Sequence, residues 1–118
     1  MNTPISAYMR VGLIHFMAYP VANGTGPIEE TFKKIAVDPF FDVVEVTWMK
    51  DEQVRNNVRF MKDTSHIDLT YGAQLRLLST KMNINDLDEE KRALAVQNLK
   101  EGIDEAYELG ASAFAFLS

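Results

Sequence analysis

The sequence predicts an α/β fold in which four parallel strands alternate with three helices. Four short apolar runs lack the strict alternation of half-exposed strands, which is typical of strands buried in a parallel sheet. The stretches between them place apolar residues three or four positions apart, the spacing of an amphipathic helix. The order strand–helix–strand–helix–strand–helix–strand favours a parallel sheet with right-handed crossovers. The four runs are residues 11–17, 41–48, 67–71 and 111–117.

The first predicted helix covers residues 27–36. Pro27 suits a first helical position, because its missing N–H group would have no partner there. Ile28, Phe32 and Ile35 follow at spacings of four and three, so they share one face. We expect this face to pack on the sheet.

The second and third predicted helices have recognisable ends. Asp51 and Asp88 are capping residues that precede helical patterns, and Gly110 can adopt the left-handed conformation that ends a helix. Gly102 is the weak point of the third helix, since glycine costs about 1 kcal/mol relative to alanine in a helix interior. The residues expected to face the sheet from this third helix are Leu94, Leu99, Ile103, Ala106 and Tyr107.

A long connection, residues 74–87, separates the third strand from the third helix. In α/β folds the segments that follow the carboxyl ends of strands supply the chemistry. This connection is therefore expected to contact substrate.

Composition excludes several classes of protein. The chain has 118 residues, with 12 Lys and Arg against 17 Asp and Glu, a net charge of −5, and no cysteine. The acidic balance argues against nucleic-acid binding, which depends on cationic side chains. The absence of cysteine excludes disulfides and thiolate metal sites. No segment has the roughly 20 apolar residues that a membrane span needs, nor a secretory signal, so we expect a cytoplasmic protein.

Three segments resemble the first part of the xylose isomerase-like TIM-barrel family, which includes sugar phosphate isomerases and epimerases. They are residues 11–16 and 41–46, which cover the first two strands, and residues 104–111, where the last helix joins the last strand. The resemblance implies a partial (β/α) barrel, with a tail over residues 1–9 and three βα units plus a fourth strand over residues 10–118. A complete barrel has eight such units.

The resemblance also implies an activity. Such enzymes shift a proton next to the carbonyl of a sugar or sugar phosphate, with a divalent metal polarising the oxygens. The family's metal ligands lie mostly on later strands, so no residue is assigned as a metal ligand, and the isolated chain is expected to be inactive. Endonuclease-like members place a histidine after the third strand, where this sequence has residues 71–74 without one. That difference argues against a DNA-repair role.

Glu45 and His15 are the candidate catalytic residues. Glu45 interrupts an apolar strand, and a buried carboxylate must be neutral, paired or coordinated. It either points into the barrel to hold a substrate hydroxyl, or pairs with Arg10 or Arg76. His15 lies toward the end of the first strand, where it is either a general base or substrate contact, or a core histidine bonded to a backbone carbonyl.

Trp48, Tyr71 and Gln74 are the candidate substrate-binding residues. All three come at or after the carboxyl ends of predicted strands. Aromatic faces pack against sugar C–H groups and amides bind hydroxyls, but aromatic side chains at such positions also fill the tops of barrels.

A different class of function is also compatible with the sequence. The chain could form a non-catalytic α/β binding or regulatory module with an open four-stranded sheet. A partial barrel, in contrast, would expose the edges of its first and last strands, and two copies could form a homodimer through them.

Overall fold

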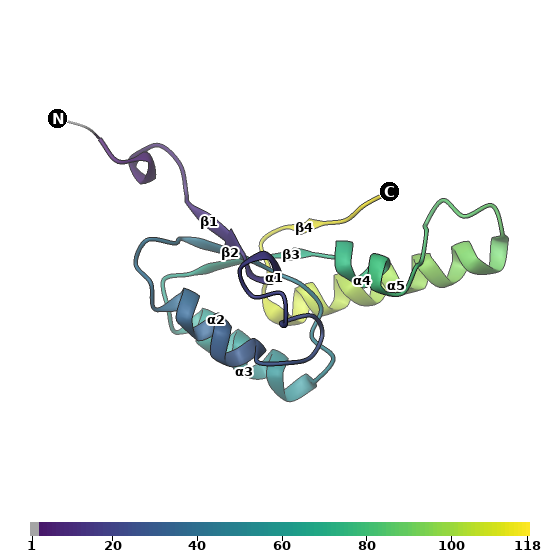
Figure 1. Ribbon diagram of the computed structural model, residues 1–118, viewed down its shortest axis with the longest axis horizontal. Coiled ribbons are helices and arrows are strands. Elements are labelled where there is room, and N and C mark those ends of the chain that lie inside the picture. The colour runs from purple at the N-terminus through teal and green to yellow at the C-terminus, as the bar shows by residue number, and fades with distance from the viewer. Residues whose placement is uncertain (1–2) are drawn as a thin grey trace.

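The computed structural model describes residues 3–118 and confirms an α/β fold built on a parallel sheet (Figure 1). The strand order follows the chain, β1-β2-β3-β4, and every neighbouring pair is parallel. The strands are β1 (Gly12–Ile14), β2 (Val43–Val46), β3 (Asp68–Gly72) and β4 (Phe114–Ala115). The turn η1 (Ile5–Ala7) lies within the predicted tail and buries no residue.

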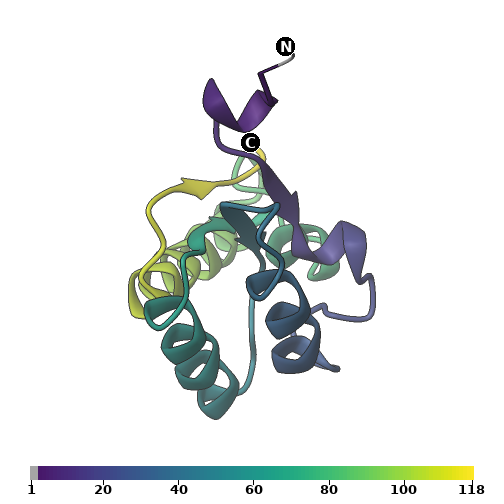
Figure 2. The same cartoon turned by 90° about the vertical axis from the view of Figure 1, so that its left-hand side faces the viewer.

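The long helices lie together on one side of this sheet, as Figure 2 shows. Their apolar side chains form one core with the strands, among them Phe32, Val58 and Leu109 against Val44 and Leu69. Burial of this apolar area is the main stabilising contribution to the fold. The helices are α1 (His15–Ala18), α2 (Ile28–Ala36), α3 (Glu52–Asp63), α4 (Gln74–Ser79) and α5 (Glu89–Leu109).

Within residues 3–118, no helical layer covers the second face of the sheet (Figure 2). The register of the strands determines which side chains lie on this face. Ile14 pairs with Glu45, and Glu45 pairs with Thr70. Side chains at paired positions point to the same face, and adjacent residues point to opposite faces. Ile14 is 41% exposed on this open face, whereas Val44 and Leu69 face the helices and are fully buried.

The predicted caps of the second and third helices are confirmed, whereas Pro27 is the N-cap residue of α2 and not its first helical residue. The Asp51 carboxylate accepts a hydrogen bond from the Gln53 amide at 2.8 Å, and the Asp88 carboxylate accepts one from the Lys91 amide at 3.0 Å. Gly110 ends α5 with a φ of 73°, a conformation that favours glycine.

Two predicted segments differ in the structure. The first strand ends at Ile14, and the residues expected to continue it form α1, whose turn is closed by a 2.8 Å bond from the Tyr19 amide to the His15 carbonyl. The connection over residues 74–87 begins with α4. Helices of four and six residues present too few apolar positions for their periodicity to be seen.

The face of α5 that packs on the rest of the protein agrees only in part with the predicted one: Ala106 is buried and Leu99 packs against the core, whereas Leu94 is exposed. Ile103 and Tyr107 are 50% and 87% exposed. The buried positions are Ala95, Asn98, Gly102, Glu105, Ala106 and Leu109. Polar residues occupy part of this face because they bind an arginine of α4, as described below.

Candidate functional site

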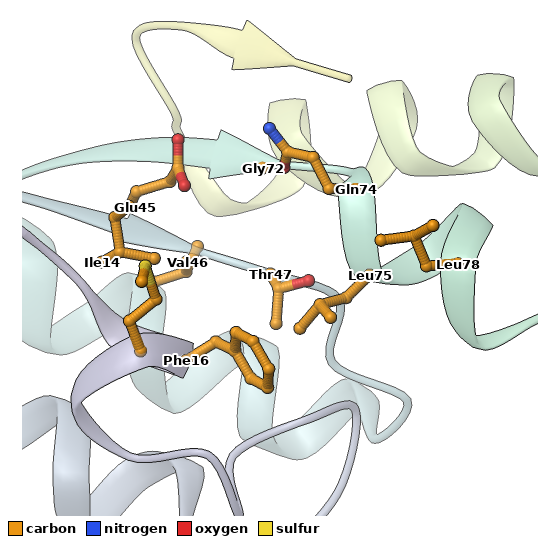
Figure 3. Close-up of a pocket in the computed structure, with 10 residues that line it drawn as sticks. Ile14, Phe16, Glu45, Val46, Thr47, Gly72, Gln74, Leu75 and Leu78 are labelled. Atoms are coloured by element: carbon orange, nitrogen blue, oxygen red, sulfur yellow. The ribbon is translucent and has the colours of Figure 1, made fainter. Parts of the chain in front are cut away.

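A cavity of about 280 Å³ lies where β1, β2 and β3 reach their carboxyl ends (Figure 3). Segments that are distant in the chain form its walls. Active sites of parallel α/β folds lie at this edge, because it gathers the segments that leave each strand. The lining residues are Ile14, Phe16, Met17, Glu45, Val46, Thr47, Gly72, Gln74, Leu75 and Leu78.

Glu45 presents its carboxylate to this cavity from the open face of β2. The two arginines considered as its partners are engaged elsewhere: Arg10 with Asp68 at 3.1 Å, and Arg76 with Glu105 at 2.7 Å. Within residues 3–118, no ion pair or hydrogen bond to the Glu45 carboxylate is formed. Partial burial raises the pKa of Glu45 above its ordinary value, since removal from water disfavours the charged form.

The Gln74 amide lies close to Glu45 because the residue between them is a glycine. A Cβ atom on Gly72 would lie 2.6 Å from the Gln74 Oε1 atom and 2.9 Å from the Glu45 Oε2 atom. Both side chains therefore occupy the space above Gly72, as Figure 3 shows. The sequence analysis did not identify Gly72, although a glycine within an apolar strand is itself a sign of a close approach.

Thr47 is a second residue of the cavity that the sequence analysis did not identify. Its side chain is 7% exposed, and its hydroxyl is buried without a hydrogen-bond partner in the described part of the chain. A buried hydroxyl without a partner is unfavourable. The remaining lining is apolar, from Phe16, Leu75 and Leu78 among others. The cavity therefore combines an apolar wall with a small group of polar side chains, as small-molecule sites do.

Tyr71 and Trp48 lie outside the lining of this cavity. Tyr71 is fully buried on the helical face of β3, where its ring stacks on Phe114 with 5.4 Å between centroids. Burial raises the pKa of Tyr71 above its ordinary value. The Trp48 indole donates to the Asn23 side chain at 2.6 Å, and the Lys50 ammonium lies 4.7 Å from the ring centroid.

His15 also lies away from the cavity, on the side of α2. It is 1% exposed, and its Nε2 atom lies 2.7 Å from the Thr31 hydroxyl. The Thr31 hydroxyl also lies 2.7 Å from the Pro27 carbonyl, so the His15 ring is joined through Thr31 to the first turn of α2. Burial lowers the pKa of His15 to about 4, so the imidazole is neutral at physiological pH. Of the five candidate residues, the structure brings Glu45 and Gln74 together.

The described residues do not form a metal centre. Among residues 3–118, no three carboxylate or imidazole side chains converge as metal ligands. Glu45 alone does not make a site for the divalent metal that the family resemblance implies.

Comparison with models of known protein families gives no match, and comparison with curated proteins gives none either. The resemblance to xylose isomerase-like barrels therefore stays a prediction from the residues. Among the helices of residues 3–118, none combines the length and apolar character that crossing a membrane requires.

Proposed function

We propose that this chain is the N-terminal portion of a sugar or sugar phosphate isomerase or epimerase with a TIM-barrel fold, located in the cytoplasm. The single observation that supports a catalytic site is the Glu45 carboxylate, which has a raised pKa and lies beside the Gln74 amide in an apolar cavity. A carboxyl group in such surroundings keeps its proton to a higher pH than an exposed one, which favours proton exchange with a bound substrate. The amide can bind a substrate hydroxyl.

The strand order supports the barrel in this proposal. In a TIM barrel consecutive strands are neighbours and the helices form a single outer layer. In a doubly wound sheet the order reverses and helices cover both faces. Here the order is β1-β2-β3-β4 with the long helices on one side. The open face, with Glu45 on it, corresponds to the interior of a barrel.

Exposed apolar side chains beside both outer strands agree with an incomplete barrel. Met17 follows β1 and is 70% exposed. Ile103, Tyr107 and Phe114 line a shallow groove between α5 and β4. In a closed barrel such surfaces are covered by neighbouring βα units. We further propose that, in their absence, two copies associate through these edges.

Binding of a simple sugar tests the site. We expect D-xylose or D-fructose at millimolar concentration to shift the NMR signals of the Gly72 backbone amide and the Gln74 side-chain amide. Glu45→Gln should reduce these shifts at least fivefold, whereas the exposed control Glu30→Gln should leave them unchanged. Equal shifts in the wild type and Glu45→Gln would refute the assignment of Glu45.

Activity and association test the barrel. The isolated chain, supplied with Mg²⁺ or Mn²⁺ and the same sugars, is expected to show no turnover, because a partial barrel lacks most of the site. Light scattering after size exclusion should show dimers or larger species. Rapid turnover would contradict the partial barrel. A monodisperse, cooperatively melting monomer would instead favour the non-catalytic open-sheet module.

A further inference from the structure

We infer that Glu105 is a positioning residue that holds two of the segments lining the cavity in place, although it lies outside the cavity itself. It belongs to α5 and does not line the cavity. One wall is the segment that leaves β2, and the other is α4, which follows β3. The inference rests on the proposed function, because these walls matter only if the cavity binds a ligand.

The first contact of Glu105 fixes the segment after β2. The Met49 amide donates to the Glu105 Oε1 atom at 2.5 Å, and this contact is buried. Met49 follows the cavity residue Thr47 by two positions, and its carbonyl accepts a bond from Arg55 at 2.8 Å. Both backbone polar groups of Met49 are therefore held, which limits the movement of this wall.

The second contact fixes α4. The Arg76 Nη1 atom donates to the Glu105 Oε2 atom at 2.7 Å, and the two side chains are only 12% and 9% exposed. Arg76 follows Gln74 by two positions on the same short helix. A charge pair of this kind, out of water, is strongly disfavoured when one member is removed. The position of Gln74 therefore depends on this pair.

Other residues of α5 also contact the Arg76 side chain. The Asn98 side chain accepts from the Arg76 Nε atom at 2.5 Å, and Glu101 accepts from Nη2 at 3.1 Å. A Cβ atom on Gly102 would lie 3.3 Å from the Arg76 Cδ atom. Gly102, which is unfavourable in a helix interior, therefore leaves space for the aliphatic part of the Arg76 side chain.

The test measures how strongly the NMR signals of the Gln74 side-chain amide depend on the ionisation of Glu45. In the wild type, raising the pH should shift the Gln74 amide signals as Glu45 ionises. The part of this response that disappears in Glu45→Gln is assigned to Glu45. We expect Glu105→Gln to reduce that part at least twofold, because α4 is no longer held by a charge pair. Asp104→Asn is the matched control, since Asp104 is an exposed acidic residue on the same helix.

A purely structural role gives a different result. If Glu105→Gln, like Asp104→Asn, leaves the Gln74 response intact, Glu105 does not position the site. Should Glu105→Gln fail to fold, Glu105→Asp replaces it, because the shorter carboxylate keeps its charge but does not reach both Met49 and Arg76, and the same reduction is expected. The wild type also gives a direct check: rapid hydrogen exchange at the Met49 amide would contradict its contact with Glu105.

The outcomes separate this inference from the proposed function. If D-xylose shifts depend on Glu45 but the Gln74 response is independent of Glu105, the proposed function stands and the positioning role fails. If the Gln74 response depends on Glu105 but D-xylose shifts no signal, the positioning role stands and the sugar site fails.

Discussion

The carboxylates of Asp68 and Glu45, which lie at opposite ends of the sheet, have pKa values shifted in opposite directions. At the amino end of β3, Asp68 accepts hydrogen bonds from Arg10 at 3.1 Å, Ser112 at 3.0 Å and the Leu69 amide at 2.8 Å. Desolvation raises the pKa of Asp68, but these bonds outweigh it, so the pKa lies below its ordinary value. At the carboxyl end, Glu45 has no such bonds in the described chain, and burial raises its pKa.

This difference separates a structural carboxylate from a candidate functional one. The bonds of Asp68 join β3 to the segments before β1 and β4, so its charge contributes to the fold. Glu45 contributes no such connection, and its charge is unfavourable where it stands. A group that the fold does not use, next to a cavity, is a candidate for binding or catalysis.

The largest effect that we expect concerns His15, which the sequence placed at the carboxyl end and the structure assigns to the core. The unfolded histidine takes up a proton below about pH 6.5, whereas the buried one resists until about pH 4. The free energy of unfolding should therefore fall by about 3 kcal/mol as the pH drops from 7.5 to 4.

Urea unfolding of the wild type and His15→Gln across this range measures the effect. Glutamine is neutral and can still donate to Thr31, so the variant should show a flatter dependence. His66→Gln, on the exposed surface, is the control. If the pH dependence of the free energy of unfolding is the same in the wild type and in His15→Gln, His15 is not a buried neutral residue and is again a candidate for an accessible site.

Asp68→Asn tests the structural end of the sheet. We expect it to lower the free energy of unfolding at pH 7 by about 1 kcal/mol, since bonds to a charged acceptor are lost or weakened. Because the folded pKa is lowered, the wild type loses this advantage as the pH falls through that pKa. Chemical unfolding at pH 7 and pH 2 measures the difference, with the exposed Asp104→Asn as control; a loss that persists at pH 2 would contradict a role for the charge.

Glu45→Gln should change the free energy of unfolding less than Asp68→Asn does, and in the opposite direction. A raised folded pKa means that the native state loses stability as the pH rises from the ordinary value of 4.5 through the folded value. The variant is therefore expected to be more stable than the wild type at pH 7 and equal to it below about pH 4. Thermal unfolding at both pH values measures this. A destabilised variant at pH 7 would show that the Glu45 charge has a structural partner.

Gly72→Ala should change stability least, by less than about 0.5 kcal/mol. The atoms that a new Cβ would meet are ends of flexible side chains, Glu45 and Gln74. Their displacement should move the Glu45 carboxylate toward water and return its pKa toward 4.5. Carbon-13 NMR titration of Glu45 measures this, with Thr70→Ala on the same face as control. An unchanged Glu45 pKa would contradict the close approach over Gly72.

The sequence was sufficient for the order of the four strands, for the caps Asp51, Asp88 and Gly110, and for Glu45 and Gln74 as residues of one cavity, but not for the lengths of the first and last strands. It was not sufficient for the orientation of the Tyr71 side chain, because the register between two parallel strands cannot be determined from either strand alone. Glu45 is paired with Thr70 rather than Tyr71, so Tyr71 points to the helices. A shift of one residue would have reversed this result.

The inner face of α5 was predicted only in part, for a related reason. Apolar spacing favoured Ile103 and Tyr107, but the structure buries Asn98 and Glu105. Polar residues on a buried face are satisfied by a partner from another element, here Arg76. Such a pairing connects residues more than twenty positions apart, and periodicity within one helix cannot reveal it.

The strand order has a consequence for biosynthesis. Each strand pairs with the strand immediately before it in the chain, so no early strand must wait for a later one to be inserted beside it. The sheet can grow from one side as the polypeptide leaves the ribosome, with each completed unit serving as the template for the next.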